Sequence, residues 1–410
     1  MNSRKKWINL SITNLCIVAA LGVLMRSKII FNLPWIDYNR LVDTHGHFAF
    51  AGWVTLILTT LLVYELPGAL YNKKVYQILL ELIFASSWAT LFTSPFASCK
   101  FISEYISVGY IIITYIFSWV YINNILKTTA NKTVKLISVA SLICLILSSA
   151  GVLMLAYLFA KKSLNAILYR DALFGYLHLQ YNGFFTLAVF ALIFNKIVPM
   201  ASQRANKNIY RFAVLLCLSV IPSMFTSFLW HQATPAIHIV SVLGSLFLLL
   251  SLLWFIISIS LLSKEFKMVI SEIRYMVILS LSAFIIKIFL QSLTVFNSIN
   301  VLVFGNRPMI MGFLHMVFLG FVTLFIIAYF TQKGILNGKS YFTRFALAVF
   351  TLAVVINEIL LMLQGLGTWL VTSSPLFSWY LWGAGLLLLL GAILIAIARI
   401  KTKQGLSASL

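Results

Sequence analysis

Twelve apolar runs long enough to cross a bilayer are the feature that most constrains this chain. A membrane-spanning helix needs about 20 mostly apolar residues, and runs of this length follow one another with short connections. No connection is long enough for a soluble domain. We therefore expect an all-α, polytopic membrane protein of about twelve transmembrane helices, with residues 1–410 forming one integral membrane domain. The expected spans are residues 7–25, 45–64, 76–96, 105–125, 136–160, 172–195, 212–230, 237–262, 275–295, 308–331, 345–366 and 379–398.

The composition agrees with a chain that lives in a lipid bilayer. Hydrophobic residues make up 61% of the sequence and charged residues only 10%, which is too little charge to cover a soluble surface. The N-terminal basic residues Arg4, Lys5 and Lys6, followed by an apolar run, are also typical of a signal peptide. Because no small-residue cleavage site precedes Arg26, we expect a retained first helix.

The net charge of +21 predicts how the chain sits in the membrane. Nucleic-acid binding is a poor explanation, because the basic residues occur in small groups between the apolar runs. With a cytoplasmic N-terminus, 21 of the 30 Lys and Arg residues fall on the cytoplasmic side and eight on the other. The positive-inside rule then predicts cytoplasmic N- and C-termini in a bacterial-type inner (plasma) membrane.

All the histidines are expected at one depth of the membrane, near its outer face. One pair opens the second span, and the others lie near the outer ends of spans six, seven, eight and ten. Ionisable groups inside a membrane are costly and usually have a purpose, and imidazole is the commonest metal ligand in proteins. The six residues are His45, His47, His178, His231, His238 and His315.

Two of these histidines, on different helices, could hold haem b. A six-coordinate haem iron needs two imidazoles from opposite sides of the ring, which His315 and a histidine of the second span could supply. Side chains two residues apart on a helix point about 200° apart, so only one of His45 and His47 can face the iron. We favour His47, because the small residues after it leave room for a macrocycle. The alternative is interfacial histidines satisfied by water or backbone. No C-x-x-C-H sequence is present, which excludes a covalent c-type haem.

The remaining histidines could form a second metal site. His178 and His231, with Gln232 or His238 nearby, could hold copper, zinc or a non-haem iron. The alternative is a hydrogen-bonded polar cluster without metal. His238 follows Pro235 at the expected membrane surface, which favours an interfacial role for it.

Charged residues add two further expectations. Haem propionates need cationic partners, and outer-side arginines could serve. Charges within the spans could conduct protons, or Lys287 could form a buried ion pair with a carboxylate. The arginines are Arg40, Arg170 and Arg307, and the charges within spans are Glu81, Lys287 and Glu358.

Several short motifs resemble the catalytic subunit of haem–copper oxidases and nitric oxide reductases. Tyr176-Leu-His178-Leu-Gln-Tyr-Asn-Gly-Phe-Phe185 resembles the sixth helix of cbb-type oxidases. Trp230-His231-Gln232 resembles the end of the seventh helix in that family, and Gly312-Phe-Leu-His315 resembles the tenth. His45-x-His47-x-x-x-x-Gly52 is similar to a motif of the NnrS family. The resemblance implies a twelve-helix bundle that carries haem.

Three departures from that family pattern change what the resemblance implies. Phe313 stands where the family has the ligand of its high-spin haem. Gln232 replaces a second copper ligand, and Asn182 stands where a tyrosine is expected. The resemblance therefore implies a low-spin haem b beside an incomplete oxygen- or NO-reducing centre. The expected function is electron transfer, or binding or sensing of NO or O2, with a redox protein or oxidase subunits as partners.

Two other classes of protein fit the same sequence. Twelve spans are also common in secondary transporters, although we find no repeat between residues 1–200 and 201–410. An assembly factor that hands haem or copper to an oxidase is the third possibility. A transporter would act without haem, and an assembly factor would copurify with oxidase subunits.

Overall fold

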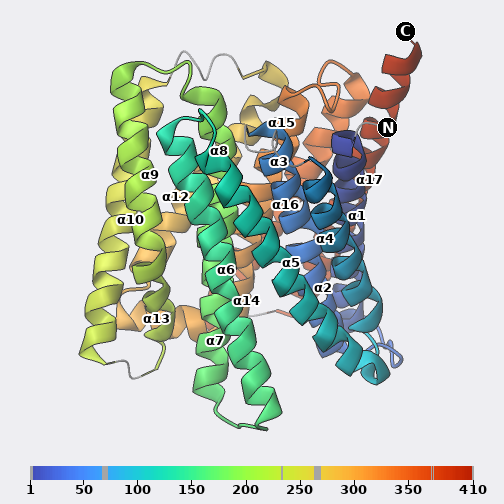
Figure 1. Ribbon diagram of the computed structural model, residues 1–410. Helices are drawn as coiled ribbons and strands as arrows, with labels where there is room; N and C mark the ends of the chain where they lie inside the picture. The colour runs from blue at the N-terminus through green and yellow to red at the C-terminus, as the bar shows by residue number, and fades with distance from the viewer. Residues whose placement is uncertain are drawn as a thin grey trace.

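The computed structural model describes residues 3–66, 73–231, 234–262, 269–370, 372 and 374–408. These residues form helices and no strands. Twelve of the described helices are long and apolar enough to cross a membrane, which confirms the expected number and indicates a multi-pass membrane protein. The helices stand side by side, and both termini lie at the upper end of the bundle (Figure 1). We call this the terminal end and the opposite one the far end.

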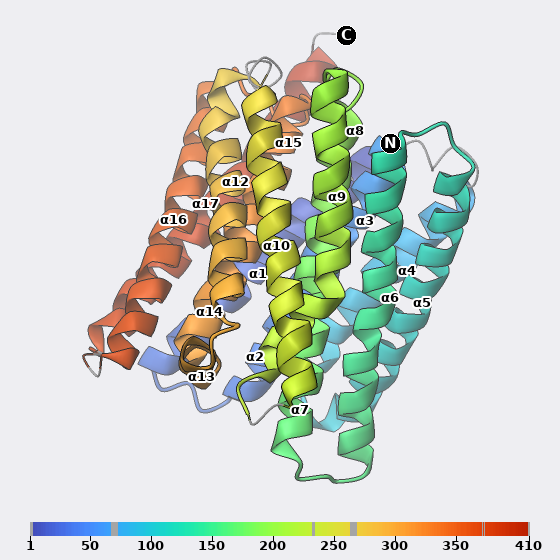
Figure 2. The ribbon, with the colours of Figure 1, turned by 90° about the vertical axis from the view of Figure 1, so that its left-hand side faces the viewer.

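The chain is built from α-helices, short 3-10 helices and π-helical segments that follow one another in sequence. In chain order they are α1 (Ser3–Ile30), α2 (Tyr38–His47), η1 (Phe48–Thr55), α3 (Leu56–Glu65), α4 (Lys73–Thr93), η3 (Ala97–Cys99), α5 (Lys100–Leu126), α6 (Lys132–Ala160), α7 (Ala166–His178), η4 (Leu179–Phe185), α8 (Thr186–Ile197), α9 (Gln203–Met224), η5 (Phe225–Phe228), α10 (Pro235–Leu261), α12 (Ser271–Leu293), α13 (Asn297–Gly305), α14 (Arg307–His315), η6 (Met316–Thr323), α15 (Leu324–Gln332), α16 (Tyr341–Trp369) and α17 (Leu376–Ala408). The short helix α13 lies at the far end in both views (Figures 1 and 2).

Three long helices form the centre of the bundle, and we call them the central helices. They are the continuous helices Tyr38–Glu65, Ala166–Ile197 and Arg307–Gln332, which are the second, sixth and tenth spans. In the most apolar window of each, 72%, 83% and 61% of the residues are buried, against 22–44% in the other nine. The central helices therefore pack against protein, while the others present more of their surface to the surroundings.

The second span begins earlier than expected, at Tyr38 rather than residue 45. The Asp37 side chain caps it, accepting a hydrogen bond from the Arg40 backbone amide at 2.9 Å, as N-cap residues do. His45 and His47 therefore lie about two turns inside the helix rather than at its mouth. The first span likewise continues past residue 25 to Ile30, so Arg26 lies within α1.

Each central helix widens into a π-helical segment directly after a histidine. The segments are η1, η4 and η6, which follow His47, His178 and His315. In all three, the histidine is followed by four variable residues and then by Gly. An aromatic residue comes next, then either Val or Phe, and the motif ends with Thr-Leu. The repeat recurs every four spans, so a comparison of two chain halves cannot detect it. π-helical turns occur mostly as single turns and often at functional sites.

Side-chain donors compensate the irregular hydrogen bonding of these segments. The Gly52 carbonyl accepts from Asn14 Nδ2 at 2.6 Å, and the Phe321 carbonyl accepts from Ser280 Oγ at 2.7 Å. Buried carbonyl groups need such partners, so polar residues of neighbouring helices support the widened turns.

The central helices meet through three phenylalanine rings, one from each. Phe50, Phe185 and Phe318 lie in mutual contact, with ring centroids 4.6–5.6 Å apart. Two of the helices are also joined by a hydrogen bond from Trp53 Nε1 to Thr323 Oγ1 at 3.0 Å. Aromatic contacts at these distances are favourable beyond the burial of their area, and they fix the three helices relative to one another.

The glycine of the repeat is required for close packing in one copy and not in another. A Cβ at Gly183 would lie 2.4 Å from Cys144 Cβ, whereas a Cβ at Gly320 would lie 3.4 Å from Ala283 Cβ. We expect Gly183→Ala to lower the free energy of unfolding by about 1–3 kcal/mol through overpacking. The matched variant Gly320→Ala should change it by less than about 0.5 kcal/mol. Thermal unfolding in detergent tests this, and equal effects of the two variants would contradict the packing.

Candidate functional site

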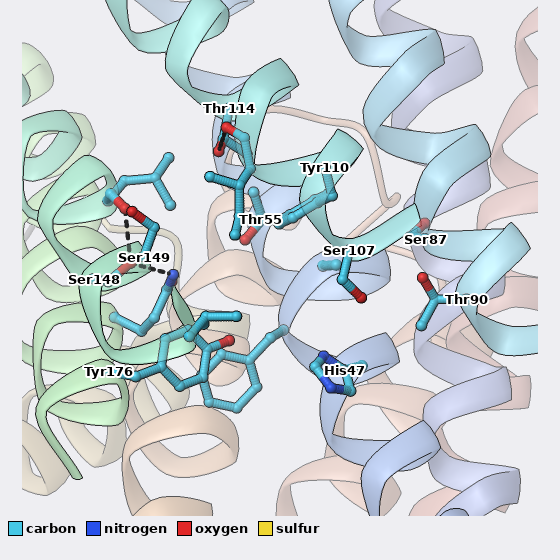
Figure 3. Close-up of a pocket in the computed structure, with 16 residues that line it drawn as sticks. His47, Thr55, Ser87, Thr90, Ser107, Tyr110, Thr114, Ser148, Ser149 and Tyr176 are labelled. Carbon is cyan, nitrogen blue, oxygen red and sulfur yellow. Dashed lines mark hydrogen bonds between the residues drawn. The ribbon is translucent and has the colours of Figure 1, made fainter. Parts of the chain in front are cut away.

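His45 and His47 face opposite sides of the second span, as their spacing requires. His45 points toward α1 and α14, where it lies within electrostatic range of His315 and Arg26. His47 points into a pocket bounded by α4, α5, α6 and α7 (Figure 3). The structure thus places His45, rather than the favoured His47, beside His315. The small residues after His47 do not indicate the direction, because they belong to the widened turn of η1.

The ring of His45 is held against α1. A Cβ at Gly22 would lie 3.4 Å from His45 Cε1 and 3.9 Å from its Nδ1, so the glycine makes room for the imidazole. The backbone carbonyl of Val18, one turn earlier, interacts with the ring. Nδ1 itself is buried and has no partner at hydrogen-bonding distance in the described chain.

His315 is oriented by its own helix. Its Nδ1 lies 2.7 Å from the Met311 carbonyl, to which it donates. That bond places the ring proton on Nδ1 and leaves Nε2 with a free lone pair, the arrangement that metal-ligating histidines commonly show. Nε2 makes no hydrogen bond to any residue that the structure describes.

A polar array from three other helices borders these two histidines. Arg26 donates to Asn357 Oδ1 at 2.6 Å and also to the Leu381 carbonyl. Asn357 Nδ2 donates to Glu358 Oε1 at 3.0 Å, and Glu358 Oε2 is buried without a partner among the described residues. We call Arg26, His45, His315, Asn357 and Glu358 the His45 site.

Sequence reasoning misses Arg26 and misplaces Glu358. By the expected spans Arg26 falls in an outer loop, although Ile29 and Ile30 after it signal that the helix continues. Glu358 is a possible partner of Lys287 by sequence, but it lies in the His45 site, and Glu81 pairs with Lys6 at 3.0 Å. The expected pair of Lys287 with a carboxylate is not formed within the described chain.

The pocket around His47 is lined by hydroxyl groups, and we call it the hydroxyl pocket. His47 is exposed to it and makes no hydrogen bond to the described residues. Water can occupy about 60 Å³ of it, enough for a few molecules. Phe50 and Tyr176 form one wall, with their rings stacked at 5.8 Å. The polar lining groups come from His47, Thr55, Ser87, Thr90, Ser107, Tyr110, Thr114, Ser148, Ser149, Tyr176 and Gln180 (Figure 3).

His178 has no free nitrogen for a metal. Its Nε2 donates to the Val220 carbonyl at 2.9 Å, and Asn182 Nδ2 donates to its Nδ1 at 3.1 Å. His231 is bound elsewhere, with Nε2 3.0 Å from Asp171 Oδ2. The two histidines therefore do not form a shared site in this arrangement.

The other residues of the expected second metal site do not complete it. His238 is exposed on α10, and Gln232 lies outside the described residues. In the described part of the chain, no group of three or more His, Cys, Asp or Glu residues could hold a metal ion. The geometry fits the alternative of a hydrogen-bonded polar cluster.

The three arginines expected near haem propionates lie in different places. The guanidinium of Arg307 is 5.9 Å from the centre of the Tyr38 ring, so it lies where the second and tenth spans begin, at the same end as the His45 site. Arg170 instead stacks over Trp230 at 3.8 Å and donates to the Phe304 carbonyl at 2.5 Å. Arg40, in the first turn of α2, and Arg307 therefore lie near the helix ends that carry His45 and His315, whereas Arg170 does not.

Comparison of the chain with protein-family models finds no match, and comparison with curated proteins finds none either. The chain's own residues must therefore carry any functional assignment.

The hydroxyl pocket should be reachable by water. In a chain whose four native cysteines are replaced, we expect Ser107→Cys to react with a small hydrophilic methanethiosulfonate reagent. Ser118→Cys is the matched control, since Ser118 lies on the same helix and is fully buried. Mass spectrometry measures the labelling. Equal labelling of the two cysteines would contradict a hydrated pocket at this position.

Proposed function

We propose that this chain is a b-type haem protein of the membrane, with a low-spin haem held between His45 and His315 and used for electron transfer. The observation that carries the proposal is the pair of imidazoles from two central helices, His315 with its Nδ1 bound to backbone and its Nε2 free. Two imidazoles from different helices are what a six-coordinate haem iron requires.

The residues present fit this group. His45 Nδ1 and Glu358 Oε2 are buried polar atoms without partners in the described chain. A Cβ at Gly46 would meet no atom within 4 Å, so the surface of α2 directly after His45 borders open space. When bound between two imidazoles, a haem iron carries one electron by cycling between its ferric and ferrous forms.

The side chains of the His45 site and Arg307 would each contribute to holding a haem. His45 and His315 would together hold the iron, which favours electron transfer over NO or O2 binding, because a gas needs a free coordination position. Arg26 would supply positive charge inside the bundle, balanced through Asn357 by Glu358. Arg307 would neutralise a propionate near the far end.

The charge distribution supports an orientation for the protein. The far end carries the histidines and few of the basic residues, so we place it at the outer face, with both termini cytoplasmic. The repeat argues against the alternative of a secondary transporter. Transporter folds are typically built from paired repeats, whereas this chain repeats its histidine motif three times.

The optical spectrum of the purified protein tests the proposal. We expect a Soret band in the wild type, and a loss of haem affinity greater than about 10-fold in His45→Ala and in His315→Ala, because each removes an axial ligand. His47→Ala is the matched control and should retain the band, since His47 faces the hydroxyl pocket.

Size-exclusion chromatography distinguishes haem loss from misfolding in these variants. A wild-type protein purified from haem-replete cells without a Soret band would contradict the proposal. So would a band that survives both ligand substitutions and is lost in His47→Ala.

A further inference from the structure

Lys287 is a buried lysine with no carboxylate partner in the part of the chain that the structure describes. Its side chain is 1% exposed and takes part in no ion pair in the described chain. Its Nζ lies 5.6 Å from the centre of the Phe284 ring, and His178 lies within electrostatic range. A buried lysine without a counter-ion carries its charge only at a cost, so a bound anion would stabilise its ammonium form.

Other buried polar atoms without partners lie beside it. Gln291 is one turn further along α12, on the same face as Lys287, and neither atom of its amide group has a partner among the described residues. Asn182 holds His178 through Nδ2, while its Oδ1 is left without a partner in that part of the chain. Both side chains are at least nine-tenths buried. We call His178, Asn182, Lys287 and Gln291 the Lys287 site.

Aromatic side chains close this site toward the terminal end. Five phenylalanine rings pack there, each with neighbouring centroids 4.8–6.2 Å away. A cluster of this density excludes water. The five residues are Phe190, Phe212, Phe255, Phe284 and Phe321.

The far end of the same region is polar and carries charges of both signs. Arg170 stacks over Trp230 there. The one carboxylate that these contacts include, Asp171, already accepts hydrogen bonds from Trp230 Nε1 at 2.9 Å and from His231 Nε2 at 3.0 Å.

We propose that the Lys287 site binds one small monovalent anion, such as chloride or nitrate. The ammonium of Lys287 supplies the charge, and the Gln291 amide group donates a hydrogen bond to the ligand. Asn182 holds His178, which lies within electrostatic range of the ammonium. The dense packing around Phe284, whose ring lies 5.6 Å from the ammonium, favours a ligand of few atoms. The Lys287 site shares no residue with the His45 site, and anion binding there does not depend on haem.

Equilibrium binding of radiolabelled chloride to the full-length protein in detergent tests this inference. We expect saturable binding of one chloride per chain in the wild type. Lys287→Met should bind at least ~10-fold more weakly, and Gln291→Leu should also bind more weakly, since charge-assisted hydrogen bonds are the strong ones. Nitrate should compete with chloride, and the much larger gluconate should not.

Lys207→Met is the matched control, because it removes the same charge from an exposed position on α9. It should bind chloride like the wild type. Lys287→Met should fold, because replacing an unpaired buried charge by an apolar side chain of similar size is not destabilising. If it fails to purify, Gln291→Leu decides the question. Absence of saturable binding in the wild type, or unchanged binding in folded Lys287→Met or Gln291→Leu, would overturn the proposal.

Discussion

The packing of three phenylalanine rings at the centre of the bundle is the contact on which the rest of the structure depends. Phe50, Phe185 and Phe318 come from the three central helices and touch one another. At the terminal end, Glu65 adds a second constraint, because it is almost fully buried and pairs with Arg4 and Lys333. These contacts hold the second and tenth spans together and align the first with them. The remaining helices then enclose separate regions around the centre.

The same sequence repeat serves different surroundings. Each copy has a histidine followed by a widened turn, yet the three histidines meet unlike neighbours. His47 faces a pocket lined by hydroxyl groups, His178 is bonded on both nitrogens, and His315 keeps a free Nε2 beside His45. In a buried imidazole, the hydrogen bond made by one ring nitrogen determines whether the second nitrogen is free to bind a proton or a metal. The chemical role open to each histidine is therefore determined by the side chains and carbonyl groups around it, and not by the repeat itself.

The number of spanning helices and their approximate positions could be predicted from the sequence, because length and apolarity are local properties. The opposite directions of His45 and His47 could be predicted from helical geometry as well. Which of the two faces His315 could not, because the answer depends on the rotation of the second span against the first and tenth. The placement of Arg26 and Glu358 in one array, and the isolation of Lys287, likewise follow from contacts between distant spans. The threefold repeat is visible in the sequence but has a period that a comparison of halves does not reveal.

Electron paramagnetic resonance of the oxidised protein tests the central claim most directly. Two imidazoles on opposite faces of a ferric haem give a low-spin signal that differs from that of a five-coordinate, high-spin iron. We predict one low-spin, bis-imidazole haem per chain in the wild type. A high-spin signal as the main species, or no haem iron in protein from haem-replete cells, would contradict this claim.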